Sequence, residues 1–214
     1  MLSKMKEMNV GQARYIVIKE LDTRGPIGQL LLNLDPQLTS TMMNLCEAIF
    51  EMDNWLSECD RVCEANNNGA GQAYPDPPTT LGFDNRYVQI IMTIADTLPA
   101  YALMYSELDW DTFCSAFATI IDNYISVAMA GIDRANFPPE QREEHERNAA
   151  MLGQCLNPIY KLVEIGAGYE ELLRASAKLV QQMKSWEQSA PSPVRLSQTY
   201  LESLGFYTKK EEGK

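Results

Sequence analysis

The sequence predicts an all-α protein, a bundle of about six helices with a long proline-rich loop and an extended C-terminal tail. Apolar residues recur at spacings of three and four over most of the 214 residues, which places them on one face of each helix. Residues that favour helix ends, namely Asp, Asn, Pro and Gly, stand where these apolar stretches begin and stop. No segment of useful length alternates between apolar and polar residues as a half-buried strand does.

The first two helices are predicted from their apolar faces and their ends. We expect the first helix over residues 10–21, and Gly25-Pro26 is expected to end it. The second is expected to begin with Asp35 as its cap and Pro36 in its first turn, where a missing N–H costs no hydrogen bond. Its apolar positions continue until about Ala65.

A long break follows at residues 66–84. Asn and Gly at its start tolerate left-handed backbone, and its prolines favour extended chain. A loop of this length in a compact protein is commonly functional. We therefore expect it to contact a partner through Tyr74, Pro75, Pro77, Pro78 and Phe83.

Two helices are predicted next. The third covers residues 85–105 and is expected to bend or break at Pro99, because proline cannot donate to the preceding turn. Asp109 is expected to cap the fourth, which has an aromatic-rich apolar face and ends in the turn 136–139.

The last two predicted helices and the tail complete the chain. The fifth helix begins at Pro139, with acidic residues in its first turns, and is expected to kink or restart at Pro158. The sixth is expected over 169–188, so that a helical domain 1–188 is followed by a tail, 189–214. In the tail, Ser192-Pro193 can open a short helix that ends before Gly205. The tail carries four further candidate contact residues, which dock either on a partner or on the chain's own body: Leu196, Tyr200, Leu204 and Phe206.

Charge and cysteine usage exclude some classes of partner. The formal net charge of −11 repels nucleic acid phosphate and anionic lipid over most of the surface, so we expect no specific nucleic acid binding. The N-terminal residues 1–10 are polar and do not resemble a secretory signal, and five scattered cysteines indicate reduced thiols inside a cell. The apolar stretch 87–104 is interpreted as a buried helix, and no membrane contact is expected.

No motif for catalysis, a cofactor or a metal is found, and none of the three is expected. The single histidine, His145, lies among charged residues and is interpreted as solvated surface. Besides the two binding roles described below, a third hypothesis is an enzyme whose site is assembled from acids dispersed in the sequence. Its candidate residues are Glu47, Glu51, Asp53 and Asp96.

The N-terminal half resembles a known family. A glycine ends the first helix at Gly25, and the second carries a Met- and Leu-rich stripe that passes through Trp55. A proline-rich loop follows at 74–78, and the next helix contains Ile94-Ala95 and then Leu98-Pro99-Ala100-Tyr101. This order, over about residues 10–105, is similar to that of bacteriophage head–tail connector (adaptor) proteins.

The resemblance implies a structural protein of the virion, assembled in the host cytoplasm. Such adaptors form a homo-oligomeric ring beneath the portal, extend the DNA channel and receive the tail, so the expected partners are further copies, portal protein and tail protein. An acidic channel would not trap the DNA that passes through it, because cation–phosphate contacts are what hold DNA. The alternative hypothesis is a cytosolic α-helical protein–protein interaction module with a regulatory role.

Overall fold

The computed structural model describes residues 8–164, and the predicted all-α fold is confirmed there. This part of the chain contains six helices and no strand. They are α1 (Val10–Asp22), α2 (Pro26–Leu34), α3 (Leu38–Asn67), α4 (Asn85–Met104), α5 (Trp110–Ala135) and α6 (Pro139–Glu164). The helix expected over 169–188 and the tail 189–214 lie outside the described residues.

Helix α5 is the centre of the bundle. It contacts α1, α3 and α6, and its side chains Phe117 and Tyr124 are almost completely buried. Within residues 8–164, α5 is the helix that is long and apolar enough to cross a bilayer. Its apolar residues instead pack against the surrounding helices, as expected for the central helix of a bundle.

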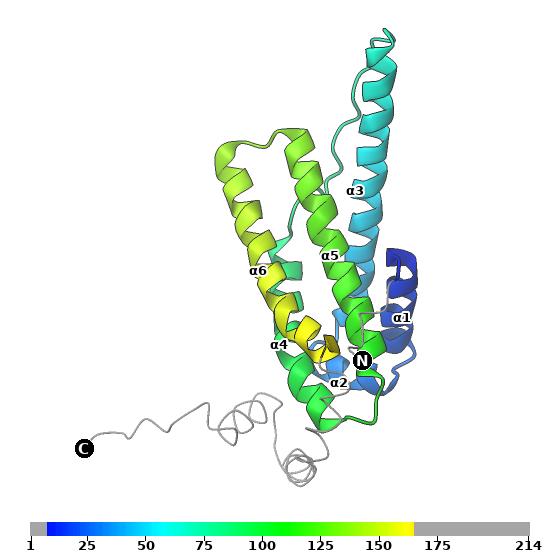
Figure 1. The fold of residues 1–214 in the computed structure, drawn as a ribbon, viewed down its shortest axis with the longest axis vertical. Helices are drawn as coiled ribbons and strands as arrows, with labels where there is room; N and C mark the ends of the chain where they lie inside the picture. Colours follow the sequence, from blue (N-terminus) through cyan, green and yellow to red (C-terminus); the bar gives the residue numbers. More distant parts are fainter. Residues whose placement is uncertain (1–7, 165–214) are drawn as a thin grey trace, which may run out of the picture.

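The other helices surround α5 in two groups. Helix α4 packs mainly on α6, whereas α1 and α2 pack on one another and on α3 (Figure 1). One apolar core cluster draws on all six helices. The long helix α3 is about 45 Å in length, from its 30 residues and the helical rise.

Helix α2 was not predicted, because Gly25-Pro26 was interpreted only as a helix end. Pro26 is instead the first residue of α2. The carboxylate of Glu20 in α1 takes the place of a capping side chain, because its Oε1 accepts hydrogen bonds from the backbone N–H groups of Ile27 (2.9 Å) and Gly28 (3.4 Å). Gly28 also lets the two helices approach closely, since a Cβ there would lie 2.1 Å from the carbonyl oxygen of Glu20.

Two predicted helix caps have different outcomes. Asp109 caps α5 as predicted, because its side chain accepts from the backbone N–H of Thr112 at 3.1 Å. Asp35 does not cap α3, which begins at Leu38. Its Oδ1 accepts from the backbone N–H of Gln37 at 2.8 Å, so the residue closes a turn between α2 and α3.

Neither proline ends its helix, because α4 continues across Pro99 and α6 across Pro158. The predicted break at Pro99 and restart at Pro158 are therefore wrong, while a bend at either proline stays a prediction. Each proline removes one N–H donor, but buried residues on both sides hold the helix in place. Leu98 and Tyr101 flank the first proline, and Ile159 follows the second. Tertiary packing therefore overrides the local preference against proline.

Candidate protein-contact site

The distal part of α3 stands clear of the bundle. Figure 1 shows α3 running past the ends of α5 and α6, with the loop 68–84 returning beside it. Trp55, Cys59 and Val62 in this part are buried, yet they do not belong to the main core cluster. We call residues 55–77, the distal turns of α3 and the first part of the loop, the arm.

The tip of the arm is closed by a pair of hydrogen bonds. The side chain of Asn66 donates to the carbonyl of Gln72 at 2.9 Å and accepts from its N–H at 2.6 Å. Gly69 (φ +86°) and Gly71 (φ +59°) between them adopt left-handed backbone. No atom crowds either glycine, so these positions need glycine for its backbone freedom and not for space.

Proline-rich chain then covers the side of α3. The indole N–H of Trp55 donates to the carbonyl of Pro75 at 3.1 Å. A cavity of about 280 Å³ remains between loop, α3 and the end of α5, and it is lined by Trp55, Cys59, Tyr74, Pro75, Pro77, Arg134 and Ala135. Arg134 also pairs with Asp60 of α3, which ties the base of the arm to α5.

The next part of the loop crosses from α3 to α5. The hydroxyl of Thr80 donates to the Glu51 carboxylate at 2.8 Å. The side chain of Leu81 fills the space that Gly131 leaves on α5, since a Cβ at Gly131 would lie 2.3 Å from its Cδ1. The loop is therefore fastened at intervals along its length.

Tyr124 of α5 holds the end of the loop. Its hydroxyl donates to the carbonyl of Gly82 at 3.1 Å and accepts from the backbone N–H of Asp84 at 3.2 Å. The ring of Phe83 packs edge-on against it, with centroids 5.2 Å apart. Burial raises the pKa of Tyr124 to about 12, so the hydroxyl keeps its proton and remains a donor at neutral pH.

His145 is a second anchor for the loop, and its interpretation as solvated surface was wrong. The ring is half-buried, and its Nδ1 accepts from the backbone N–H of Phe83 at 3.4 Å. Gly82 (φ +106°) lies so close that a Cβ there would be 2.7 Å from the ring carbon Cε1. The ring also packs edge-on against Phe137. Nothing in the charged sequence around His145 indicates its contacts with Gly82 and Phe83, because these residues are about sixty positions away.

The predicted contact residues of the loop differ in accessibility. Tyr74 is 52% exposed and Pro77 is exposed, while Pro75 and Pro78 are half-buried. Phe83 is only 7% exposed, so this prediction is corrected: Phe83 anchors the loop to the bundle and does not present a contact surface. The four predicted contacts in the tail lie outside the described residues: Leu196, Tyr200, Leu204 and Phe206.

The dispersed acids do not converge. All four are exposed on α3 or α4: Glu47, Glu51, Asp53 and Asp96. Within residues 8–164, no three His, Cys, Asp or Glu residues are placed to hold a metal ion. All five cysteines are free, and burial raises the pKa of Cys46 to about 11 and of Cys114 to about 12, which keeps both thiols protonated.

A second exposed surface, which the sequence analysis did not identify, lies on the outer side of α1 and α3. Tyr15 is 65% exposed, and Met43 and Phe50 are 37% and 38% exposed. The Arg14 guanidinium lies 5.8 Å from the centre of the Phe50 ring, and the Lys19 ammonium lies 5.4 Å from that of Tyr15. Aromatic faces attract cations at these distances. We call these residues, together with Arg24 after α1, the α1 patch.

Comparisons of the chain with protein-family models, with curated proteins and with solved structures find no match. The function is therefore argued from the arm, the α1 patch and the distribution of charge.

Proposed function

We propose that the chain is a structural virion protein of the head–tail connector kind, whose copies join head to tail into a ring between portal and tail and extend the DNA channel. The arm carries this proposal, because it projects from one end of the bundle (Figure 1). A projection at one end suits a heterologous interface, in which two different surfaces meet, and such interfaces form a ring when the rotation between copies closes.

The fastening of the loop supports a binding role for the arm. Hydrogen bonds from Trp55, Thr80 and Tyr124 hold the loop in one conformation before any partner arrives. A preorganised surface loses less conformational entropy on binding than a flexible one. The arm also exposes Tyr74, and tyrosine is enriched in protein–protein interfaces.

The charge distribution supports a place beside DNA without DNA binding. Between Arg24 and Arg86 the only cationic residue is Arg61, and its guanidinium pairs with Glu58. An acidic surface facing a channel repels phosphate and lets DNA slide. The proposed partners are accordingly further copies of the chain, portal protein and tail protein, and the proposed location is the virion, assembled in the host cytoplasm.

The proposal is tested by the mass and shape of the native particle. Native mass spectrometry and negative-stain electron microscopy of the full chain at micromolar concentrations are expected to give one closed ring of defined copy number. Tyr74→Ala, which truncates an exposed aromatic of the arm, is expected to shift the particle toward monomer. Gln154→Ala, at an exposed position of α6, is the matched control and should leave the ring unchanged.

A chain that stays monomeric alone and after mixing with a portal ring would contradict the connector proposal. That result would favour the alternative of a monomeric interaction module. Open filaments in place of rings would retain head-to-tail assembly and reject the connector geometry.

A further inference from the structure

The cations of residues 8–164 differ in their partners. Four of them pair with carboxylates of the same chain: Arg61, Arg86, Arg134 and Arg142. The other five form no ion pair with any described residue: Arg14, Lys19 and Arg24 of the α1 patch, and Arg147 and Lys161 of α6. The patch therefore combines cations without carboxylate partners and exposed aromatic rings on one side of the molecule.

The arm has the opposite character. Glu64 and Asp76 are exposed and form no ion pair with residues 8–164. They lie on either side of the exposed Tyr74 in the sequence, within the stretch that has Arg61 as its single cation. Carboxylates and an exposed aromatic ring on the arm complement cations and exposed apolar side chains on the α1 patch.

We propose that the arm of one copy docks on the α1 patch of a second copy. This inference rests on the proposed head-to-tail assembly and names the interface that builds it. The carboxylates of Glu64 and Asp76 pair with Lys19 and Arg24 of the neighbour. The ring of Tyr74 packs on the exposed apolar side chains of the neighbour's α1 patch.

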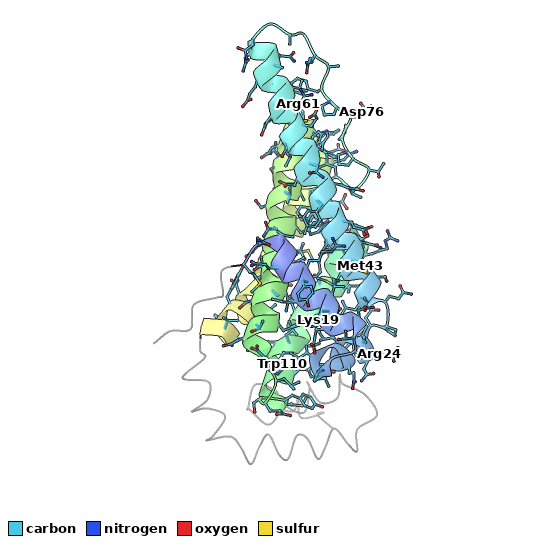
Figure 2. The ribbon with its side chains drawn as sticks, turned by 90° about the vertical axis from the view of Figure 1, so that its right-hand side faces the viewer. Lys19, Arg24, Met43, Arg61, Asp76 and Trp110 are labelled. Atoms are coloured by element: carbon cyan, nitrogen blue, oxygen red, sulfur yellow. The ribbon has the colours of Figure 1, made fainter. Side chains whose placement is uncertain are left out.

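The charged residues of the two surfaces lie too far apart to pair within one copy. Met43 and Arg61 belong to the same continuous helix and are about 27 Å apart along its axis, from 18 residues at the helical rise. Figure 2 shows Arg61 and Asp76 toward one end of the molecule and Lys19 and Arg24 toward the other. Because α3 is unbroken between them, these charges of the arm and of the α1 patch can pair only when they belong to two different molecules.

Acidic residues beside the α1 patch narrow its choice of partner. Asp22 and Glu47 are exposed on the same two helices, and Glu20 is held by the N-terminus of α2. A long polyanion such as DNA would meet these carboxylates as well as the cations. The arm is compact, presents few carboxylates and adds an aromatic side chain. It therefore fits the α1 patch better than DNA does.

The test exchanges the charges of the two surfaces. In the patch variant, Lys19→Glu is combined with Arg24→Glu, and in the arm variant Glu64→Lys is combined with Asp76→Lys. Each is expected to weaken self-association about tenfold or more, since two attractive pairs become repulsive at every contact. A variant with all four substitutions restores opposite charges across the contact, and it should recover self-association. A one-to-one mixture of the two variants should assemble as well.

Matched controls carry the same change in net charge elsewhere. Arg147→Glu with Lys161→Glu, on exposed positions of α6, matches the patch variant. Asp96→Lys with Glu143→Lys, also exposed, matches the arm variant. Sedimentation equilibrium measures the association constants, and circular dichroism establishes that each variant is folded. The variant with all four substitutions separates a lost contact from a folding defect, because a misfolded chain would not recover self-association.

Each outcome decides the inference. Loss in both variants, none in the controls and recovery in the four-fold variant supports docking of the arm on the α1 patch. If the wild type is oligomeric but the patch and arm variants associate as strongly as their controls, this interface is wrong. The proposed assembly is then retained. A wild type that is monomeric at all concentrations overturns both the interface and the proposed function.

Discussion

The two halves of α3 are the same helix with two kinds of support. Its first half, up to Met52, contributes buried side chains to the core that all six helices share. Its second half buries Trp55, Cys59 and Val62 apart from that core, and the loop covers its side. The first half is held by apolar packing against several helices. The second is held by the returning loop, a few hydrogen bonds and the ion pair of Asp60 with Arg134 at the end of α5.

A projecting helix can be kept rigid without a large apolar core around it. Helices far from a core lack apolar burial, which is the main stabilising contribution to folding. Here the loop returns along the helix and supplies local burial at Trp55 together with fixed hydrogen bonds. The arm should therefore open locally at lower free energy than the bundle unfolds.

Loss of a core side chain should unfold both regions together. Phe117 is 1% exposed in α5, and Phe117→Ala is expected to lower the free energy of unfolding by about 3–5 kcal/mol, through lost burial and a new cavity. Urea unfolding followed by circular dichroism measures it. The matched control is Phe50→Ala, 38% exposed on α3, which should cost under about 1 kcal/mol. Equal losses in the two variants would mean that the bundle core is not where stability is concentrated.

Removal of one hydroxyl should loosen the junction of arm and bundle. Tyr124→Phe deletes the donor to the Gly82 carbonyl and the acceptor for the Asp84 N–H. Because both partners are left unsatisfied in part-buried positions, we expect a loss of about 1–3 kcal/mol in the free energy of unfolding. Thermal and urea denaturation measure the loss, and Tyr15→Phe, at a largely exposed position, should have no effect. An unchanged stability would contradict the anchoring role of the hydroxyl.

A change in the arm alone should leave the bundle intact. Trp55→Phe removes the hydrogen bond to the Pro75 carbonyl, and we expect a local loss of about 1 kcal/mol. Hydrogen exchange measured by mass spectrometry should become faster in residues 68–77 and in the distal turns of α3, with α5 unchanged. Faster exchange throughout α5 would show that arm and bundle open as one unit.

The smallest effect is expected at low pH. The Arg86 guanidinium holds the pKa of Asp84 below its ordinary value, so the ion pair stabilises the fold above that value and is lost as pH falls through the lowered one. Asp84→Asn should thus destabilise slightly at neutral pH and not at all below the lowered pKa. Urea unfolding from neutral to acidic pH measures the difference in free energy of unfolding between the two proteins. A difference that persists in strong acid would show that it does not come from the Asp84–Arg86 ion pair.

The sequence predicts the helices whose ends are marked by local chemistry. Asp109 caps α5, and the loop begins and ends close to the predicted residues, because capping and left-handed glycine depend on near neighbours. Helix α2 was not predicted, because the backbone N–H of Ile27 in its first turn is hydrogen-bonded by Glu20 of the preceding helix and not by a local capping residue. A proline after glycine followed by apolar residues at helical spacing was the available signal.

The candidate site was predicted less completely than the fold. Tyr74 and the prolines were placed correctly in an exposed loop, since loops of this composition lie on the surface. The anchors Tyr124 and His145 were not identified, because each meets the loop across more than forty residues of sequence. The α1 patch was not identified, although Tyr15, Met43 and Phe50 fall outside the apolar stripes of their helices, because only the fold brings α1 and α3 side by side.

The unbroken course of α3 makes it a mechanical lever. A rotation of about 5° at the bundle end of a helix about 45 Å long moves the far end by about 4 Å. Packed cores and rigid helices transmit such displacements with little damping. In the proposed assembly, a neighbour bound at the tip of the arm would be displaced by small changes in the tilt of the bundle. A change of angle in one copy would then become a change of position in the next.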